Sequence, residues 1–159
     1  MNFFIPTEVF LLIKRLSKFF ATAFYVGLIP IAPGTMASLE ALVWIYLFFP
    51  KGTVVQIILC VLSFALGVFT ARVMTQETGH PDPPQVVIDE VCGMFITFFM
   101  IPISAKSLVL GFILFRVFDI FKLPWIRRME TIPHGYGVMA DDVAAGLLSH
   151  IALRLILSI

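Results

Sequence analysis

The feature that most constrains the fold is a run of 22 residues, Thr53 to Met74, whose single charged side chain is Arg72, near its end. A helix needs about 20 apolar residues to cross the hydrocarbon of a bilayer, so this run predicts a transmembrane helix. Composition agrees, because 60% of the 159 residues are apolar, 13% are charged and the mean hydropathy is +1.01. The net charge of +1 argues against a nucleic-acid-binding surface. We therefore expect a membrane protein.

Further apolar runs lie between turns rich in proline, glycine and polar residues, and no alternating strand pattern competes with them. The expected fold is all-α, a compact helical membrane protein with several apolar helices and with polar loops that converge on one face. Residues 1–18 are expected to form an amphipathic segment on the membrane surface, and residues 19–159 the helical membrane domain. Because the run 38–49 has only 12 residues, some helices are expected to be broken or too short to span alone. The other helices are expected at 86–101, at 107–121 and from about Asp141 onward.

The order of the turns predicts that the polar segments meet at one end of the molecule. If the chain reverses at 50–52 and again at 102–106, every other polar stretch falls at the opposite end. Most basic residues are expected at that polar end: Lys14, Arg15, Lys18, Arg72, Arg116, Lys122, Arg127 and Arg128. The positive-inside rule then places the polar end in the cytoplasm.

Five carboxylates lie in these polar stretches: Asp89, Glu90, Asp119, Asp141 and Asp142. An ionised group near hydrocarbon costs roughly 2.5–3.5 kcal/mol on insertion scales, so grouped acids need a compensating cation. Neighbouring residues of a helix point about 100° apart, so one acid of each adjacent pair can face a shared site while the other braces it. Oxygen ligands without histidine or cysteine clusters indicate Mg²⁺. The alternative is that each pair simply occupies the first turn of a helix, where the macrodipole favours acids.

Arg116, Asp119 and Lys122 are spaced at i, i+3 and i+6, so on a continuing helix they share one side. Two interpretations remain open for this set. The side chains form either an ion-pair ladder at the membrane edge or, together with the other acids, part of a site for an anionic substrate.

The segment 31–39, IAPGTMASL, places a Pro-Gly-Thr turn ahead of a helix. Backbone N–H groups and hydroxyls at such a helix start suit an anion. The alternative is that Thr35 or Ser38 is simply the N-cap of the helix. Two loop histidines at the polar end, His80 and His134, are candidates for proton transfer or are merely solvated.

Four motifs follow one another along the chain: GLIPIAPGTMASL (27–39), VVIDEVCGM (86–94), FRVFDIFKLPWI (115–126) and GYGVMADDVAAG (135–146). Together they resemble the phosphatidylglycerophosphatase A family. The resemblance implies a Mg²⁺-dependent phosphatase of the bacterial inner membrane that hydrolyses phosphatidylglycerophosphate to phosphatidylglycerol and inorganic phosphate in glycerophospholipid synthesis. By this resemblance the metal and catalytic set is Asp89, Glu90, Asp119, Asp141 and Asp142. The candidates for binding the substrate phosphate are Thr35, Ser38, Arg116 and Lys122.

The expected mechanism keeps the lipid substrate in the leaflet while its terminal phosphate reaches the polar end of the protein. Either a water activated by Mg²⁺ or an aspartate acting as a covalent nucleophile attacks phosphorus, and the sequence leaves both routes open. Three alternatives remain: a cation or proton transporter with acids along its path, a phosphatase for a different phosphomonoester, and a non-catalytic membrane scaffold. A transporter predicts charges near the middle of helices, whereas nearly all charges here lie near helix ends. No protein partner is implied.

Overall fold

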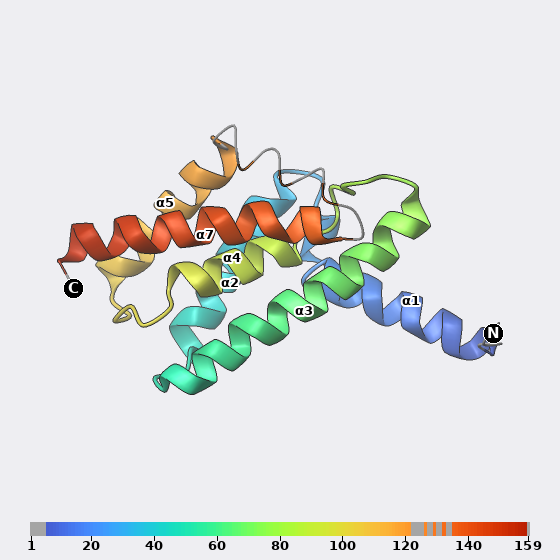
Figure 1. Ribbon diagram of the computed structural model, residues 1–159, viewed down its shortest axis with the longest axis horizontal. Helices are drawn as coiled ribbons and strands as arrows, with labels where there is room; N and C mark the ends of the chain where they lie inside the picture. The colour runs from blue at the N-terminus through green and yellow to red at the C-terminus, as the bar shows by residue number, and fades with distance from the viewer. Residues whose placement is uncertain (1–5, 122–125, 127–128, 130–131, 133–134, 159) are drawn as a thin grey trace.

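The computed structural model describes residues 6–121, 126, 129, 132 and 135–158. Their elements are helices: α1 (Thr7–Ala21), the 3-10 helix η1 (Val26–Leu28), α2 (Pro33–Phe48), α3 (Thr53–Thr78), α4 (Ile88–Thr97), α5 (Ala105–Ile120) and α7 (Tyr136–Leu157) (Figure 1). No strand occurs among the described residues. The predicted all-α fold is confirmed.

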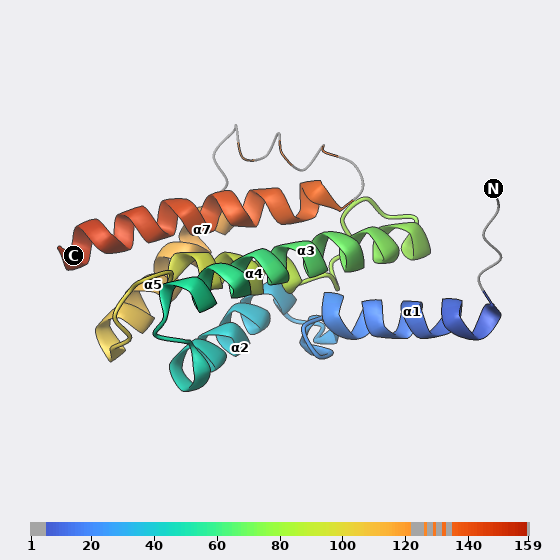
Figure 2. The same cartoon turned by 60° about the horizontal axis from the view of Figure 1, so that its bottom comes forward.

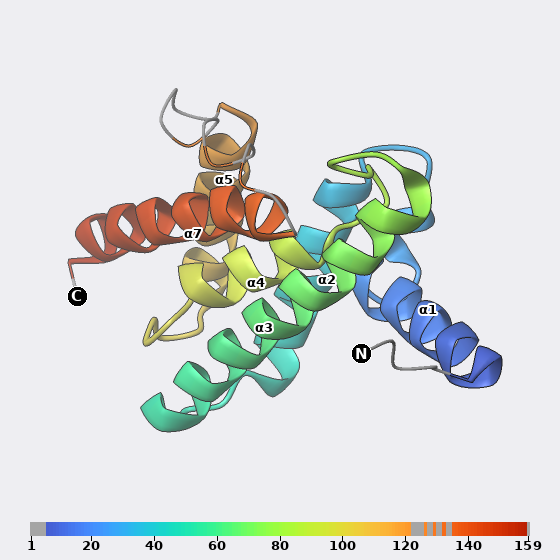
Figure 3. The same cartoon turned by 45° about the vertical axis from the view of Figure 1, so that its right-hand side comes forward.

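The short helix α4 is the centre of the bundle. It packs against α7, α2, α3 and α5, and Figures 1 and 3 show α7 and α3 on either side of it. Helix α1 extends away from the bundle and packs along the later part of α3 (Figure 2). There the Lys14 ammonium lies 3.5 Å from the Glu77 carboxylate.

Within the described residues, α3 is the one helix that is long and apolar enough to cross a membrane, with 26 residues and a mean hydropathy of 2.4 in its most apolar stretch. The predicted end at Met74 is wrong, since the helix continues to Thr78. Helix α2 is also apolar but shorter, with 16 residues. Large apolar side chains are exposed along both helices, among them Tyr46, Phe48 and Leu62. An apolar surface of this extent suits contact with lipid.

A single glutamine joins the two turns at one end of the bundle. The Met100 N–H donates to Gln56 Oε1 over 2.8 Å, and Gln56 Nε2 donates to the Pro50 carbonyl over 2.6 Å. The α2–α3 turn and the α4–α5 turn therefore lie together, as predicted from their order. The first turns of α2 and α4 and the last turn of α5 are left at the opposite end.

Helix α2 begins before both residues that were predicted as its N-cap, Thr35 and Ser38. Pro33 is its first residue and Ala32 its N-cap residue, because the fixed φ of proline suits the first helical position. Thr35 and Ser38 consequently lie inside the helix, so the prediction that one of them caps it is wrong. The Ser38 hydroxyl instead donates to the Gly34 carbonyl over 2.8 Å.

Helix α4 is shorter than the predicted range 86–101. At its start the Val87 N–H donates to the Ala21 carbonyl over 2.8 Å, which ties this residue to the end of α1 instead of the helix. The short length places Asp89 and Glu90 in the first turn of α4. This turn lies against α2 and α3, because a Cβ on Gly34 would overlap the Glu90 carboxylate and a Cβ on Gly67 would lie 3.5 Å from the Ile88 side chain.

Candidate active site

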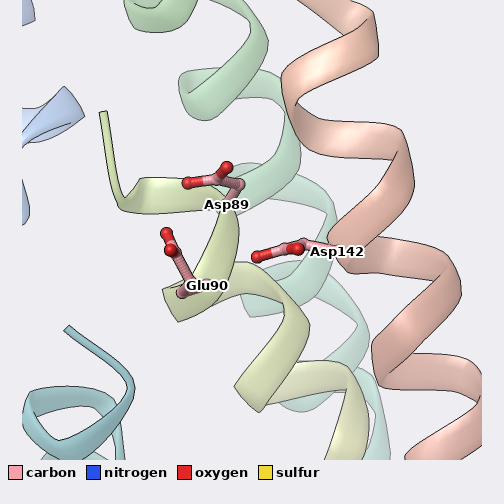
Figure 4. A group of neighbouring side chains, drawn as sticks. All are labelled: Asp89, Glu90 and Asp142. Carbon is pink, nitrogen blue, oxygen red and sulfur yellow. The ribbon is translucent and has the colours of Figure 1, made fainter. Parts of the chain in front are cut away.

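Three carboxylates from two helices lie together at the polar end of the bundle. Asp89 and Glu90 come from the first turn of α4 and Asp142 comes from α7, with one oxygen of each within 4.8 Å of the others. Figure 4 shows Asp142 reaching from its helix toward the turn that carries Asp89 and Glu90. The expected convergence of acids distant in sequence is thus present for these three.

Helix α7 begins at Tyr136 and not at about Asp141 as predicted, so the Asp141–Asp142 pair lies deeper in the helix than expected. Gly135, at φ 82°, precedes the first helical residue, Tyr136, so the two acids lie in the second turn rather than the first. Both are buried, with 4% and 2% of their surface exposed. A place in the first turn, favoured by the macrodipole, therefore does not account for this pair, because the dipole effect fades within the first turn.

The other two predicted acids, Asp119 of α5 and Asp141 of α7, lie close enough to the three carboxylates to affect their pKa values. Burial, and then the charge of Asp119, raise the pKa of Asp142 well above its usual range. Burial, and then the charges of Glu90 and Asp142, raise the pKa of Asp89 in the same way. The charge of Asp141 adds to the effect on Asp89. Asp119 and Asp141 thus act electrostatically on the three central carboxylates.

Several oxygens of this group are buried without a hydrogen-bond partner among the described residues: Asp89 Oδ1, Glu90 Oε2 and Asp142 Oδ2. A buried anionic oxygen without a partner is costly, because burial removes its hydration and provides nothing in return. A divalent cation between the three acids would compensate their buried negative charge, since each acid has one oxygen within 4.8 Å of the others. An all-oxygen ligand set suits hard cations such as Mg²⁺. The residues present therefore fit a metal site.

Arg116 of α5 adds a cation at the edge of this group. Its Nη1 lies 2.6 Å from Asp119 Oδ2, and the same nitrogen donates to Ser38 Oγ on α2 over 3.3 Å. The prediction that Arg116 and Asp119 share one side of a helix is confirmed. Because Ser38 belongs to another helix, the arginine is held from two sides.

The first turn of α2 approaches the acids through its backbone. A Cβ placed on Gly34 would overlap the Glu90 carboxylate and lie 3.6 Å from Arg116 Nη1. A side chain at this position would displace the Glu90 carboxylate from its place beside α2. The N-terminal end of α2, where backbone N–H groups favour anions, therefore lies beside Glu90 and Arg116.

Comparison with known proteins identifies the family of the chain. The sequence model of the family described as phosphatidylglycerophosphatase A matches residues 19–157. The chain belongs to this family. A phosphatidylglycerophosphatase A of Escherichia coli is 36% identical over 132 residues, covering 81% of this chain and 76% of the relative. One from Haemophilus influenzae is 36% identical over 136 residues, covering 84% and 83%.

A third relative carries a different name. A protein of Bacteroides thetaiotaomicron named as a putative phosphatidylinositol-3-phosphatase is 36% identical over 140 residues, covering 83% of this chain and 87% of its own. No solved structure matches the chain. Membership of the phosphatidylglycerophosphatase A family makes the protein an enzyme, a phosphoric monoester hydrolase.

Each of the four motifs that resemble the phosphatidylglycerophosphatase A family contributes to the site. In chain order these contributions are Gly34 and Ser38, then Asp89 and Glu90, then Arg116 and Asp119, then Asp141 and Asp142. Thr35 is half-buried in the same first turn of α2 as Gly34. Lys122 and His134 lie outside the described residues. His80 is exposed in the loop after α3, where its Nδ1 lies 2.9 Å from the Asp82 carbonyl oxygen.

The sequence analysis missed two glycines that bring together the helices carrying the acids of this candidate site. Gly93 of α4 and Gly146 of α7 pack backbone against backbone. Each follows an acid by four residues, Asp89 in one helix and Asp142 in the other, so each lies on the same helix face as its acid. The repeated spacing was visible in the sequence and is the signal that could have identified them.

Proposed function

We propose that the protein is a Mg²⁺-dependent phosphatase that hydrolyses phosphatidylglycerophosphate to phosphatidylglycerol and inorganic phosphate in glycerophospholipid biosynthesis. The observation that carries the proposal is the group formed by Asp89, Glu90 and Asp142. One carboxylate oxygen of each lies within 4.8 Å of the others, and each acid also has a buried oxygen without a hydrogen-bond partner among the described residues. The names of two relatives support the substrate, since both are phosphatidylglycerophosphatases.

The metal site would be formed by Asp89, Glu90 and Asp142. When bound there, the cation would supply positive charge to the phosphoryl group and lower the energy of the charge that develops during hydrolysis. Asp119 and Asp141 remain proposed members of the metal and catalytic set. Their burial beside the three ligands supports that assignment.

The phosphate would lie between the acids and Arg116. The guanidinium is oriented by Asp119 and Ser38, and it can donate charge-assisted hydrogen bonds to a phosphate oxygen. The first turn of α2, at Gly34 and Thr35, offers backbone N–H groups from another side. Lys122 follows α5 in the sequence and remains a proposed phosphate contact.

The proposed setting is the bacterial inner membrane, with the site facing the cytoplasm. Helix α3 supports a membrane location because of its length and apolar surface. Basic residues support the orientation, since Arg116 belongs to the site and Arg72 lies in the last two turns of α3, at the same end of the bundle. The positive-inside rule places such an end in the cytoplasm.

A phosphoinositide is the second candidate substrate. The relative from Bacteroides thetaiotaomicron is as similar to this chain as the two phosphatidylglycerophosphatases, at 36% identity in each case. The name of that relative implies that its substrate is phosphatidylinositol 3-phosphate. The two lipids share a phosphomonoester at the membrane surface, so the acids and Arg116 suit either.

Phosphate release by the purified protein in detergent tests the proposal. The substrates are phosphatidylglycerophosphate, phosphatidylinositol 3-phosphate and a soluble phosphomonoester, each with Mg²⁺ and with EDTA. We expect the highest kcat/KM for phosphatidylglycerophosphate and no release in EDTA. A preference for the phosphoinositide would favour the second candidate, and equal activity in EDTA would refute the metal site.

A further inference from the structure

An apolar groove runs along the side of the bundle, between α2 and α3. The cavity has a volume of about 540 Å³, which is in the range of small-molecule binding sites. Its walls include Phe20 of α1, Trp44 and Phe48 of α2, Leu59 and Leu62 of α3, and Val91 of α4. The polar side chains among the described lining residues are Glu40 and Ser63. The Trp44 N–H donates to Glu40 over 3.4 Å, so this acid is held against the wall.

The groove follows the direction of the helices from the polar end of the bundle toward the opposite end. Ile88, the first residue of α4, lines it near the acids, and Phe95 lines it seven residues later. At 1.5 Å per residue this stretch of α4 is about 10 Å long. Phe49, Pro50 and Val55 line the far end, where the Phe49 ring centroid lies 5.9 Å from that of Phe95.

We propose that this groove binds an acyl chain of the lipid substrate, an inference that rests on the proposed function. One wall belongs to α3, the helix suited to cross the membrane, and the rim residues Phe48 and Leu62 are 67% and 61% exposed. The groove therefore opens onto the apolar surface that faces lipid. A hydrocarbon chain is the occupant that the bilayer supplies there.

The volume favours a chain over a helix from a partner or from a second copy. A helix with its side chains is about 10 Å across, so it could insert only the side chains of one face into the cavity and would leave the rest of its volume outside. A single flexible chain can enter from the side without separating α2 from α3. The occupant is thus expected to be a lipid tail.

The position of the groove relative to the acids also determines the path that the lipid headgroup must take to the metal site. On a helical wheel Glu90 lies about 200° from Ile88, so the groove and the metal site are on different sides of the first turn of α4. A lipid with its tail in the groove would therefore pass its headgroup around the N-terminal end of α4 to reach the acids.

Two neighbouring residues of α3 provide a matched test. Leu62 lines the groove, whereas Val61 does not belong to its described lining, and the two are 61% and 59% exposed. Leu62→Trp should fill part of the groove and lower kcat/KM for long-chain phosphatidylglycerophosphate by about tenfold or more, within the range of a lost apolar contact. Val61→Trp should leave it unchanged. Equal kinetics for the two variants would overturn the proposal.

A binding measurement separates this inference from the proposed function. Phosphatidylglycerol with a photoreactive diazirine in one acyl chain is added to the detergent-purified protein in EDTA, where no turnover is needed. We expect labelled peptides from the groove walls of α2, α3 and α4, competition by unlabelled phosphatidylglycerol, and loss of this labelling in Leu62→Trp but not in Val61→Trp. Labelling of the groove without hydrolysis of phosphatidylglycerophosphate would reject only the proposed function. Hydrolysis without such labelling would reject the groove.

Light scattering tests the alternative that a second copy of the chain occupies the groove. If Leu62→Trp changes the oligomeric state in light scattering while the kinetics and labelling match those of Val61→Trp, the groove is a contact between copies and the proposal is wrong.

Discussion

Gly146 of α7 lies against the backbone of Gly93 in α4, so closely that a Cβ on Gly146 would be 2.5 Å from the Gly93 carbonyl oxygen. Only glycine permits this approach. Asp142 and Asp89 stand one helical turn earlier on the same helices, and the side chain of Asp142 points toward α4 (Figure 4). The spacing between these acids is therefore set by two residues that have no functional group of their own.

Gly146→Ala should push α7 away from α4. Overpacking of a tight contact costs about 1–3 kcal/mol, so we expect a lower unfolding temperature in detergent together with a loss of phosphate release. Gly52→Ala is the control, because a Cβ there meets its nearest neighbour at an ordinary 3.7 Å. A Gly146→Ala enzyme with unchanged stability and activity would show that the two helices do not need this contact.

Asp142→Asn should separate the catalytic role of this acid from its effect on stability. We expect phosphate release to fall by more than about 100-fold, since loss of even a supporting group at a metal site costs 10–100-fold. In EDTA the same variant should unfold at a higher temperature. The raised pKa of Asp142 means that its ionised form destabilises the folded protein at neutral pH, and asparagine removes that charge.

The control for Asp142→Asn is Glu77→Gln on α3. Glu77 is a partly exposed acid paired with Lys14, away from the five clustered acids. Its replacement should leave phosphate release unchanged and alter stability by less than about 1 kcal/mol, as is usual for surface ion pairs. An Asp142→Asn protein that unfolds at a lower temperature in EDTA would contradict the electrostatic account.

Mg²⁺ should stabilise the folded protein through the acids. A ligand at 100 times its Kd stabilises by about 2.7 kcal/mol if it binds only the folded state. We expect unfolding temperature to rise on titration with Mg²⁺, and both this rise and phosphate release to disappear in EDTA. Asp89→Asn should abolish the rise in temperature. An identical response to Mg²⁺ in Asp89→Asn would remove this residue from the metal site.

The apolar runs were enough to predict the all-α fold, and the order of the turns was enough to predict that the acids gather at one end. Gln56 shows why this worked, since it bonds to Pro50 and Met100 and so fixes two turns at one end. Hydrophobic runs report which segments are helical, and the number of reversals then decides which ends meet. That argument needs no knowledge of individual contacts.

Helix starts and contacts between distant residues could not be predicted in the same way. The start of α7 depends on Gly135 rather than on the first charged residues, so Asp141 and Asp142 lie one turn deeper than expected. The bond between Ser38 and Arg116 joins residues 78 positions apart. Such a contact depends on how closely the helices pack, which sequence periodicity does not encode.

Ser38→Ala tests whether that distant contact positions the arginine. Ser38 accepts from Arg116 over 3.3 Å, and its loss should lower kcat/KM about two- to tenfold, because one hydrogen bond is worth about 0.5–1.5 kcal/mol. Ser149→Ala is a matched control. Ser149 is also buried and donates to the Ala145 carbonyl over 2.7 Å, as Ser38 donates to Gly34. Both variants should lose similar stability. If they also lose similar activity, the Ser38 hydroxyl serves only the helix and does not orient Arg116.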